Sequence, residues 1–250
     1  MTDTETLETP SGRRLAYRRS LGDGAGAARP GVIFLGGLRS DMTGAKAEAL
    51  HEWAAREGRA FLRFDYSGHG ASSGRFEEGS IADWAEDAFA ALSMLTAGPQ
   101  ILVGSSMGGW VSLILARKAP ERVAAFVGIA AAPDFTASLA AEMDDAARKE
   151  MAETGVWSRP SEYSDEPYPI GRRLIEEGPE SYVLDRPLRL ACPVRLFQGT
   201  ADEDVPQEVA LRLLAHLESP DARLTLVKGA DHRFSGPAEL ALLIETVAAL

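Results

Sequence analysis

The segment "GSSMG" at residues 104–108 has the spacing of a reactive-serine motif, G-x-S-x-G, with Ser106 at its centre. In this motif a strand ends in a sharp turn and a helix begins at once, so the central hydroxyl projects above the sheet. A side chain at Gly104 or Gly108 would collide with the neighbouring strand or helix, and Ser105 still belongs to the strand end. The motif predicts Ser106 as a nucleophile. The alternative is an ordinary turn in which Ser106 caps a helix.

A serine hydroxyl needs a neighbouring base before it can attack a carbonyl at neutral pH. Of the four histidines, His51 and His216 lie within predicted helices, where we expect them to be partly exposed, and His69 lies in a glycine-rich loop. His232 follows the last predicted strand and precedes the last helix, which is where the base lies in the chain order serine, acid, histidine. We therefore predict His232 as the base. The alternative is a histidine in a surface loop.

An acidic side chain must hold such a base in one tautomer. Asp202, in "GTADEDVP" (199–206), lies just after a predicted strand and between the serine and the histidine in sequence, so it is the predicted acid. Asp134, in "AAPDF", also follows a predicted strand and stays open as an alternative. Asp204 suits the turn before the next helix or the cap of that helix. Asp231 is too close to the histidine in sequence to reach its Nδ1.

Two backbone N–H groups are needed to stabilise the negative charge that develops on the substrate oxygen. The N–H of Met107 follows the nucleophile at the start of a helix, where the helix dipole favours negative charge. The second donor is predicted in the loop after the strand "GVIFLGG". Gly36 and Gly37 let that backbone approach closely, so the N–H of Leu38 is the candidate. A simple tight turn at these two glycines is compatible with this role.

The composition is that of a globular protein and disfavours two classes of partner. Hydrophobic residues make up 45% and charged residues 25% of the 250 residues, which are ordinary proportions. The formal net charge of −11 repels nucleic acid and anionic membrane surfaces, so neither is expected as a partner. The sequence has no dinucleotide, P-loop or zinc-binding motif, so no cofactor and no metal is predicted. It leaves the oligomeric state open.

The N-terminus and the hydrophobic pattern predict a cytoplasmic protein without a membrane span. The first ten residues, "MTDTETLETP", are acidic and polar, unlike a secretory signal or a mitochondrial transit peptide. The apolar runs are too short and interrupted to cross a bilayer. Cys192 is the single cysteine, and it is predicted to be a buried thiol at a strand edge.

Predicted strands alternate with predicted helices, which favours an α/β fold with a mostly parallel central sheet and helices on both faces. The continuous apolar run "GVIFLGG" (31–37) is typical of a buried central strand, and "RRLAYRR" (13–19) is predicted to be an exposed early strand. Further strands are predicted at 59–66, 100–105, 122–132, 194–199 and 223–229, and helices at 43–58, 81–97, 207–217 and 237–249, with another beginning at Ser106. Residues 1–250 are therefore predicted to form one domain.

Residues 134–190 interrupt this alternation. They contain a helix-prone piece (138–154), a segment rich in Pro, Ser and Tyr, and a second predicted helix (171–178). Long insertions are usually functional, and ligands of open α/β sheets bind beyond the carboxyl ends of the strands. We predict that residues 134–190 form a helical cap over the serine. The alternative is a helical insertion that lies away from the site and has no role in it. The substrate-binding candidates of the predicted cap are Trp157, Tyr163, Tyr168 and Ile170.

These pieces resemble the α/β-hydrolase fold superfamily over nearly the whole chain. The segments "GSSMGGW", "FDYSGHGASSG", "AAPDF", "CPVRLFQGTADEDVP" and "GADHRFS" occur in the order typical of that superfamily. More narrowly, the set resembles the abhydrolase-domain family of palmitoyl-protein thioesterases, also known as acyl-glucuronide esterases. The resemblance implies a catalytic triad and an oxyanion hole. It assigns nucleophile, acid, base and the two oxyanion donors to Ser106, Asp202, His232, Leu38 and Met107.

The sequence departs from the superfamily pattern at two places. Many of these hydrolases carry His-Gly before the oxyanion loop and before the acid, whereas this chain has Leu35-Gly36 and Gln198-Gly199. Neither departure removes a catalytic group.

The predicted function is a serine hydrolase that cleaves carboxylic esters or thioesters through an acyl-enzyme, similar to an acyl-protein thioesterase. A C–C hydrolase, a peptidase or an acyltransferase would use the same triad. A non-catalytic binding protein on this fold is a further alternative, although it would not need all three residues. The acidic surface makes polyanionic acyl-CoA less suitable than a neutral ester or an S-acylated protein, unless Arg172 and Arg173 form a local basic rim.

Overall fold

A computed structural model describes residues 3–160 and 167–250 of the chain. Its main feature is an eight-stranded sheet in the order β1-β2-β4-β3-β5-β6-β10-β12. β1 (Glu5–Glu8) pairs antiparallel with β2 (Arg14–Ser20), and β2 pairs antiparallel with β4. All other neighbours are parallel, which confirms the predicted mostly parallel α/β sheet. The parallel strands are β3 (Gly31–Leu35), β4 (Phe61–Phe64), β5 (Gln100–Ser105), β6 (Val123–Ile129), β10 (Val194–Gly199) and β12 (Ala222–Val227).

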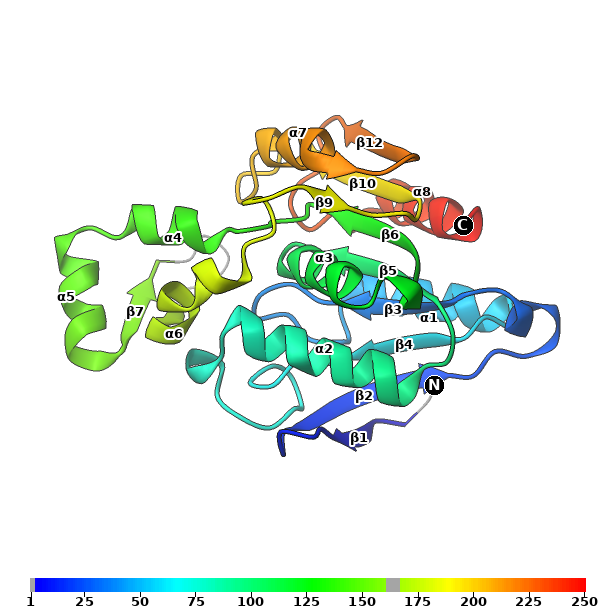
Figure 1. Cartoon of the computed structure of the whole chain (residues 1–250), viewed down its shortest axis with the longest axis horizontal. Helices are drawn as coiled ribbons and strands as arrows, with labels where there is room; N and C mark the ends of the chain where they lie inside the picture. The colour runs from blue at the N-terminus through cyan, green and yellow to red at the C-terminus, as the bar shows by residue number, and fades with distance from the viewer. Residues whose placement is uncertain (1–2, 161–166) are drawn as a thin grey trace.

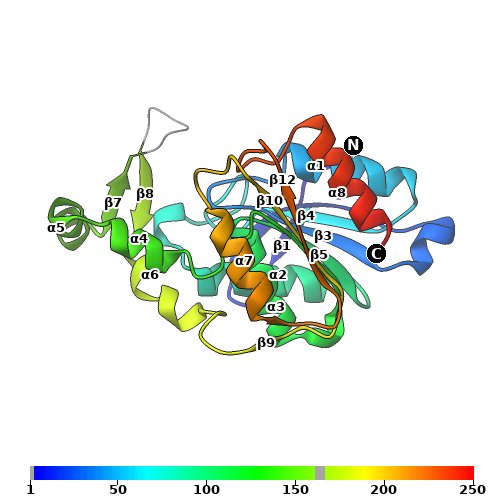
Figure 2. The same ribbon diagram turned by 90° about the horizontal axis from the view of Figure 1, so that it is seen from above.

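Helices cover both faces of this sheet (Figures 1 and 2). One face carries α1 (Ala45–Arg56) and α8 (Pro237–Ala248), and the other carries α2 (Ile81–Leu95), α3 (Met107–Lys118) and α7 (Gln207–His216). Successive residues of β5 point to opposite faces. Ile101 and Val103 are buried in the core under α1 and α8, and Leu102 is buried in the core on the other side. The strand sequences are continuously apolar because both of their faces are covered.

Two early segments are more buried than the sequence predicts. The run "RRLAYRR" was expected to be exposed, but Leu15 and Tyr17 of β2 are buried in the core under α2. His51 of α1 is buried as well, and its ring stacks on Phe61 with centroids 5.0 Å apart. Both errors arise because local periodicity does not reveal which neighbour covers an edge strand or a helix. Cys192 is half-buried just before β10, and burial raises the pKa of its thiol.

The insertion between β6 and β10 contains a helical part and a hairpin. The predicted helix 138–154 is two helices, because Asp144 breaks it and caps the second one by accepting the N–H of Ala147 at 2.8 Å. The Pro-rich segment contributes a strand pair that the sequence did not predict, with Trp157 opposite Ile170. The elements are α4 (Thr136–Glu142), α5 (Asp145–Thr154), β7 (Val156–Arg159), β8 (Tyr168–Gly171) and α6 (Arg172–Glu176), followed by β9 (Leu188–Arg189), which pairs with β11 (Leu217–Glu218).

The insertion extends beyond the edge of the sheet where β6 ends (Figure 2). A Cβ at Gly171 would collide with the carbonyl of Glu77, so β8 packs tightly on the short 3-10 helix η2 (Phe76–Glu78). The indole N–H of Trp110, on α3, donates to the carbonyl of Ser181 at 3.0 Å. The insertion therefore lies against the elements that follow the carboxyl ends of β4 and β5. Among the described residues, no helix is long and apolar enough to cross a bilayer.

Candidate active site

Ser106 occupies the turn between β5 and α3 in a strained conformation, with φ 53° and ψ −117°. Such dihedrals cost energy for a non-glycine residue and persist only when the surroundings enforce them. The N–H of Ser106 donates to the carbonyl of Ile129 at 2.9 Å, and its carbonyl accepts the N–H of Ala132 at 3.1 Å. The hydroxyl makes no capping bond to α3. The geometry is therefore that of the predicted elbow and not that of a serine helix cap, while Ser105 is buried in the strand.

The two glycines of the motif are required by close backbone contacts. A Cβ on Gly108 would collide with the carbonyls of Leu35 and Gly36 at the end of β3. A Cβ on Gly104 would collide with the carbonyl of Gly108 and lie 2.5 Å from the hydroxyl of Ser112. Any side chain here would push α3 away from the sheet and change the position of Ser106.

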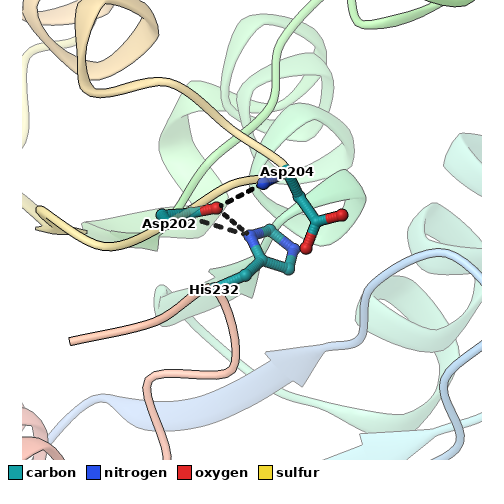
Figure 3. A group of neighbouring side chains, drawn as sticks. All are labelled: Asp202, Asp204 and His232. Carbon is teal, nitrogen blue, oxygen red and sulfur yellow. Dashed lines mark hydrogen bonds and ion pairs between the residues drawn. The ribbon is translucent and has the colours of Figure 1, made fainter. Parts of the chain in front are cut away.

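Asp202 and His232 meet between the loops after β10 and β12 (Figure 3). Nδ1 of His232 lies 2.9 Å from Oδ2 and 3.1 Å from Oδ1 of Asp202. The Asp202 side chain is fully buried, whereas the imidazole is 21% exposed. Oδ1 of Asp202 also accepts the backbone N–H groups of Asp204 at 3.0 Å and Val205 at 2.8 Å. These bonds hold the carboxylate so that Nδ1 of the imidazole faces it.

Burial alone would raise the pKa of Asp202, but the hydrogen bonds from His232, Val205 and Gln198 outweigh it and lower the pKa. Gln198 is fully buried, and its amide donates to Oδ2 of Asp202 at 2.8 Å and to the carbonyl of Val205 at 2.9 Å. In the sequence, Gln198 stands out only as a departure from a common His-Gly pattern. Its position four residues before the predicted acid was the available signal.

The carboxylates of two other aspartates near these loops, Asp134 and Asp231, accept backbone N–H groups. The carboxylate of Asp134 accepts the backbone N–H groups of Val183 at 2.8 Å and Leu184 at 3.0 Å. Asp204 is predicted to shape the turn before the next helix or to cap that helix. Its N–H donates to Oδ1 of Asp202 at 3.0 Å in the segment before α7, but α7 begins after Pro206 without a side-chain cap. Asp231 accepts the N–H of Phe234 at 3.1 Å within the loop that carries His232. Lys46 of α1 donates to the carbonyl of Arg233 and ties this loop to the core.

The loop after β3 lies against Ser106. A Cβ built on Gly37 would be 3.4 Å from Cβ of Ser106, so the backbone of Gly37 passes directly beside the serine. In the part of the chain that the structure describes, the N–H groups of Leu38 and Met107 donate to no other group. The next residue, Arg39, has φ 55° and turns the chain away. Gly37 thus lies beside the serine, and the roles of Leu38 and Met107 as oxyanion donors stay predictions.

Two other histidines make contacts outside the Asp202–His232 pair. His69 is buried among the rings of Tyr66, Phe76 and Trp84, and burial lowers the pKa of its imidazole to about 4. His216 contacts the carbonyl of Arg186 at 2.7 Å.

The predicted substrate-binding residues of the insertion have different surroundings. Trp157 and Ile170 are buried in the core that the insertion shares with the sheet. Tyr168 is half-buried beneath the guanidinium of Arg39, which lies 4.9 Å from the ring centre. Tyr163 lies outside the described residues. Two of the four candidates thus fill the interior of the insertion, and Tyr168 connects it to the loop beside Ser106.

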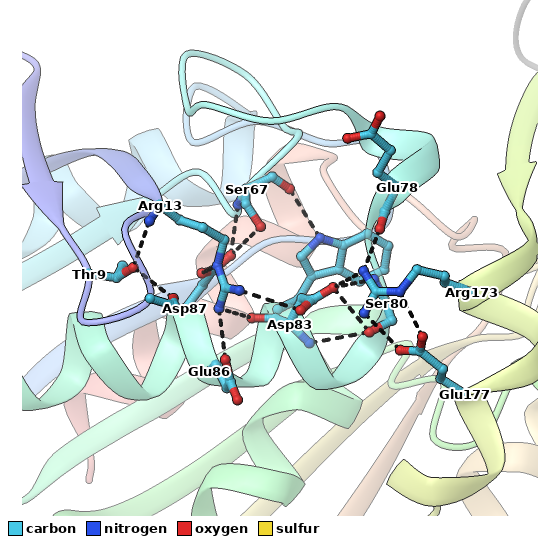
Figure 4. Close-up of polar contacts among 12 residues, drawn as sticks. Thr9, Arg13, Ser67, Glu78, Ser80, Asp83, Glu86, Asp87, Arg173 and Glu177 are labelled. Atoms are coloured by element: carbon cyan, nitrogen blue, oxygen red, sulfur yellow. Dashed lines mark hydrogen bonds and ion pairs between the residues drawn. The ribbon is translucent and has the colours of Figure 1, made fainter.

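A charged network fixes the insertion to α2 (Figure 4). Arg173 binds Glu177 at 2.6 Å and Asp83 of α2 at 2.8 Å, and it donates to the carbonyl of Glu78 at 2.7 Å. Asp83 also contacts Arg13 from the turn after β1 at 3.4 Å. Arg172 donates to the carbonyls of Met151 and Ala152. The charge of Arg173 is therefore neutralised within the protein, whereas Arg172 binds only carbonyls in these contacts, so the argument against a basic rim applies to Arg173 alone.

Asp202, Asp204 and His232 are also a group that could hold a cation, because one ligand atom of each lies within 4.8 Å of the others. Since Asp202 and His232 already share hydrogen bonds, a cation would have to displace them. The arrangement fits an acid–base pair better than a metal site.

Neither of two surface hollows is lined by Ser106 or His232. One, of about 280 Å³, lies beside Cys192 at the start of β10. The other, of about 380 Å³, lies within the insertion between Met143, Met151 and Ile175. An acyl-binding pocket over the serine stays a prediction.

Comparison with known proteins shows the family to which the chain belongs. The alpha/beta hydrolase fold family matches residues 46–156. The mitochondrial palmitoyl-protein thioesterase ABHD10 of Rattus norvegicus is 40% identical over 242 residues, which cover 96% of this chain and 80% of that protein. The Homo sapiens protein of the same name is 37% identical over 247 residues, which cover 98% and 79%.

Two solved structures are similarly close. Alpha/beta hydrolase domain-containing protein 10 from mouse has a TM-score of 0.89 at 38% identity and covers 99% of this chain and 97% of its own. A protein from Agrobacterium vitis S4 has a TM-score of 0.94 at 40% identity, covering 100% and 98%. The chain therefore belongs to the α/β-hydrolase fold family. Within that family it belongs with the ABHD10 proteins, as its motifs predict.

The relatives are named as mitochondrial proteins, which gives no support to the cytoplasmic location predicted from the N-terminal sequence.

Proposed function

We propose that this protein is a serine hydrolase that cleaves carboxylic esters or thioesters, with Ser106 as nucleophile, His232 as base and Asp202 as the acid that orients it. One observation carries the proposal. A serine held at φ 53° at the end of β5 lies on the same edge of the sheet as an Asp–His pair joined at 2.9 Å. The carboxyl ends of parallel strands meet at one edge, where ligands of such sheets bind.

In the first half of the reaction, Oγ of Ser106 attacks the acyl carbonyl while Nε2 of His232 takes the hydroxyl proton. Asp202, bonded to Nδ1, keeps the imidazole in the tautomer whose Nε2 is free to accept. The negative charge of the tetrahedral intermediate is stabilised by the N–H groups of Leu38 and Met107. His232 then gives its proton to the leaving alcohol or thiol.

In the second half, water attacks the acyl group on Ser106 while His232 takes the proton of that water. Collapse of the second tetrahedral intermediate releases the acid, and His232 returns the proton to the serine. Ester and thioester pass through the same intermediates, so the triad by itself does not select between them.

We propose an S-acylated protein or a neutral ester with an acyl chain longer than acetate as the substrate. The relatives are named palmitoyl-protein thioesterases, which are 37–40% identical to this chain. We further propose that residues 134–190 are a cap over the serine, because β8 and α6 pack beside the loop that follows β4. Each methylene buried there would contribute up to about 0.8 kcal/mol, and only the part gained in the transition state raises the rate.

Labelling with a fluorophosphonate tests the nucleophile. Wild-type protein should be labelled, and Ser106→Ala should lose both labelling and hydrolysis. The loss of kcat should be about 10⁶-fold, as for the serine of a well-studied protease. The matched control is Ser105→Ala, which should keep most of the activity because Ser105 is buried in the strand. A reversed pattern would move the nucleophile to Ser105.

A series of p-nitrophenyl esters and S-acyl peptides tests the substrate class. We expect kcat/KM to rise from acetate to medium-length chains. A steady fall from acetate onward would indicate a small pocket and would contradict this substrate proposal while leaving the triad intact.

A further inference from the structure

We propose that Ser40 is a positioning residue that orients the oxyanion donor of Leu38. This inference rests on the proposed hydrolase function, and it concerns a residue that none of the sequence motifs contains. The hydroxyl of Ser40 donates to the carbonyl of Gly37 at 2.7 Å, and the N–H of Ser40 reaches the same oxygen at 3.2 Å.

The carbonyl of Gly37 and the N–H of Leu38 belong to one peptide group. This peptide is trans and planar, so its C=O and N–H bonds point in opposite directions. Two hydrogen bonds that fix the direction of the carbonyl therefore also fix the direction of the N–H. Ser40 binds the end of the peptide opposite to the one that would face the substrate oxygen.

The two glycines before Leu38 leave space for the hydroxyl of Ser40, and their flexible backbone needs the restraint that this hydroxyl provides. A Cβ at Gly36 would lie 2.9 Å from Oγ of Ser40, so a side chain there would press on the hydroxyl. Two adjacent glycines also make this backbone unusually free to rotate. The hydroxyl of Ser40 restricts a peptide that its own sequence leaves flexible, directly beside Ser106.

The two hydrogen bonds to the carbonyl of Gly37 also strengthen the N–H of Leu38 as a hydrogen-bond donor. A carbonyl that accepts two hydrogen bonds polarises its peptide group, and such cooperative effects are about 10–30% per bond. The N–H of Leu38 has no competing acceptor within the described ranges of the chain. The peptide is thus oriented and polarised before substrate binds, which is the condition for effective oxyanion stabilisation.

Ser40→Ala removes the hydroxyl bond and keeps the backbone bond. We expect kcat to fall about tenfold with KM within twofold, because the donor remains but loses its orientation; loss of a whole oxyanion donor costs about 10²–10³-fold. Ser40→Thr keeps a hydroxyl and should retain wild-type kcat within about threefold. The matched control is Thr43→Val, which removes a hydroxyl of the same loop that donates to Asp41 instead of to Gly37. It should leave kcat unchanged.

A boronic acid that forms a tetrahedral adduct with the serine provides the decisive readout. Its affinity for Ser40→Ala should fall by the same factor as kcat/KM, while the midpoint of thermal unfolding changes no more than in Thr43→Val. Unchanged boronate affinity, or a loss equal in Ser40→Ala and Thr43→Val, would overturn the role of Ser40. Failure of the hydrolase proposal would look different, because wild-type protein itself would then bind neither boronate nor fluorophosphonate.

Discussion

The ends of the neighbouring strands β6 and β10 each place an aspartate in the loop that follows, yet the two carboxylates have different partners. Asp134 accepts two backbone N–H groups from Val183 and Leu184, where the insertion returns to the sheet. Asp202 also accepts two backbone N–H groups, from its own loop, but it additionally binds His232 at 2.9 Å. Asp134 is therefore a structural clamp, a side chain that joins the insertion to the end of β6, whereas Asp202 also faces a titratable partner.

The two environments shift the pKa values in opposite directions. Burial raises the pKa of Asp134, and the bonds from Val183 and Leu184 only partly offset it. At Asp202 burial also acts to raise the pKa, but the bonds from His232 and its other donors outweigh it and the pKa falls. A partner that becomes positively charged during the reaction needs an ionised carboxylate beside it, and the hydrogen bonds at Asp202 favour its ionised form.

The sharpest test of this comparison is Asp202→Asn. The amide favours the wrong tautomer of His232, an effect of about 10⁴-fold on kcat in a well-studied triad. We expect a loss of that order with fluorophosphonate labelling slowed in parallel. Circular dichroism should be unchanged. If Asp134→Asn proved the more damaging of the two, the acid would have to be moved to the end of β6.

A second test removes the carboxylate of Asp134, which joins the insertion to the end of β6. Asp134→Ala leaves two backbone N–H groups without their acceptor, which should cost about 2 kcal/mol of unfolding free energy. Activity should stay within about threefold of wild type at a temperature where the protein remains folded. Urea unfolding and kcat measured on the same sample separate the two effects. A large fall of kcat without loss of stability would break the distinction between the two aspartates.

The smallest expected effect is a difference in the pH dependence of stability. Because the pKa of Asp202 is below its ordinary value of 3.8, the stability it contributes is present above about pH 4 and is lost as pH falls through the native pKa. The pKa of Asp134 is above 3.8, so its ionisation costs stability at neutral pH and that cost disappears as the pH falls.

This difference is measured as the change in unfolding free energy between wild type and each Asn variant, at pH 6 and pH 3.5. The advantage of wild type over Asp202→Asn should shrink on acidification. The stability of wild type relative to Asp134→Asn should rise. Equal trends for both variants would contradict the opposite pKa shifts.

The sequence alone predicted the features that depend on residues close to one another along the chain. Ser106 was recognisable because G-x-S-x-G encodes a steric requirement, and the structure has the predicted turn with φ 53° and two glycines in tight backbone contact. Strands such as β5 were predicted within a residue because both faces are buried and the run is continuously apolar. Chain order then indicated that an acid and a histidine should follow near later strand ends.

Only the tertiary structure decided which side chains meet. Asp134 and Asp202 both follow strands, and the choice between them depends on Val183 and His232, which lie 49 and 30 residues away in the sequence. The burial of His51 and the β7–β8 pair likewise depend on distant neighbours. Hydrogen bonding and desolvation act over a few ångströms in space, whereas a sequence pattern reports only neighbours along the chain. The hydrogen bond from Gln198 to Asp202 joins residues only four positions apart, yet it could not be predicted from the sequence. It depends on the conformation of the loop between them, which only the structure shows.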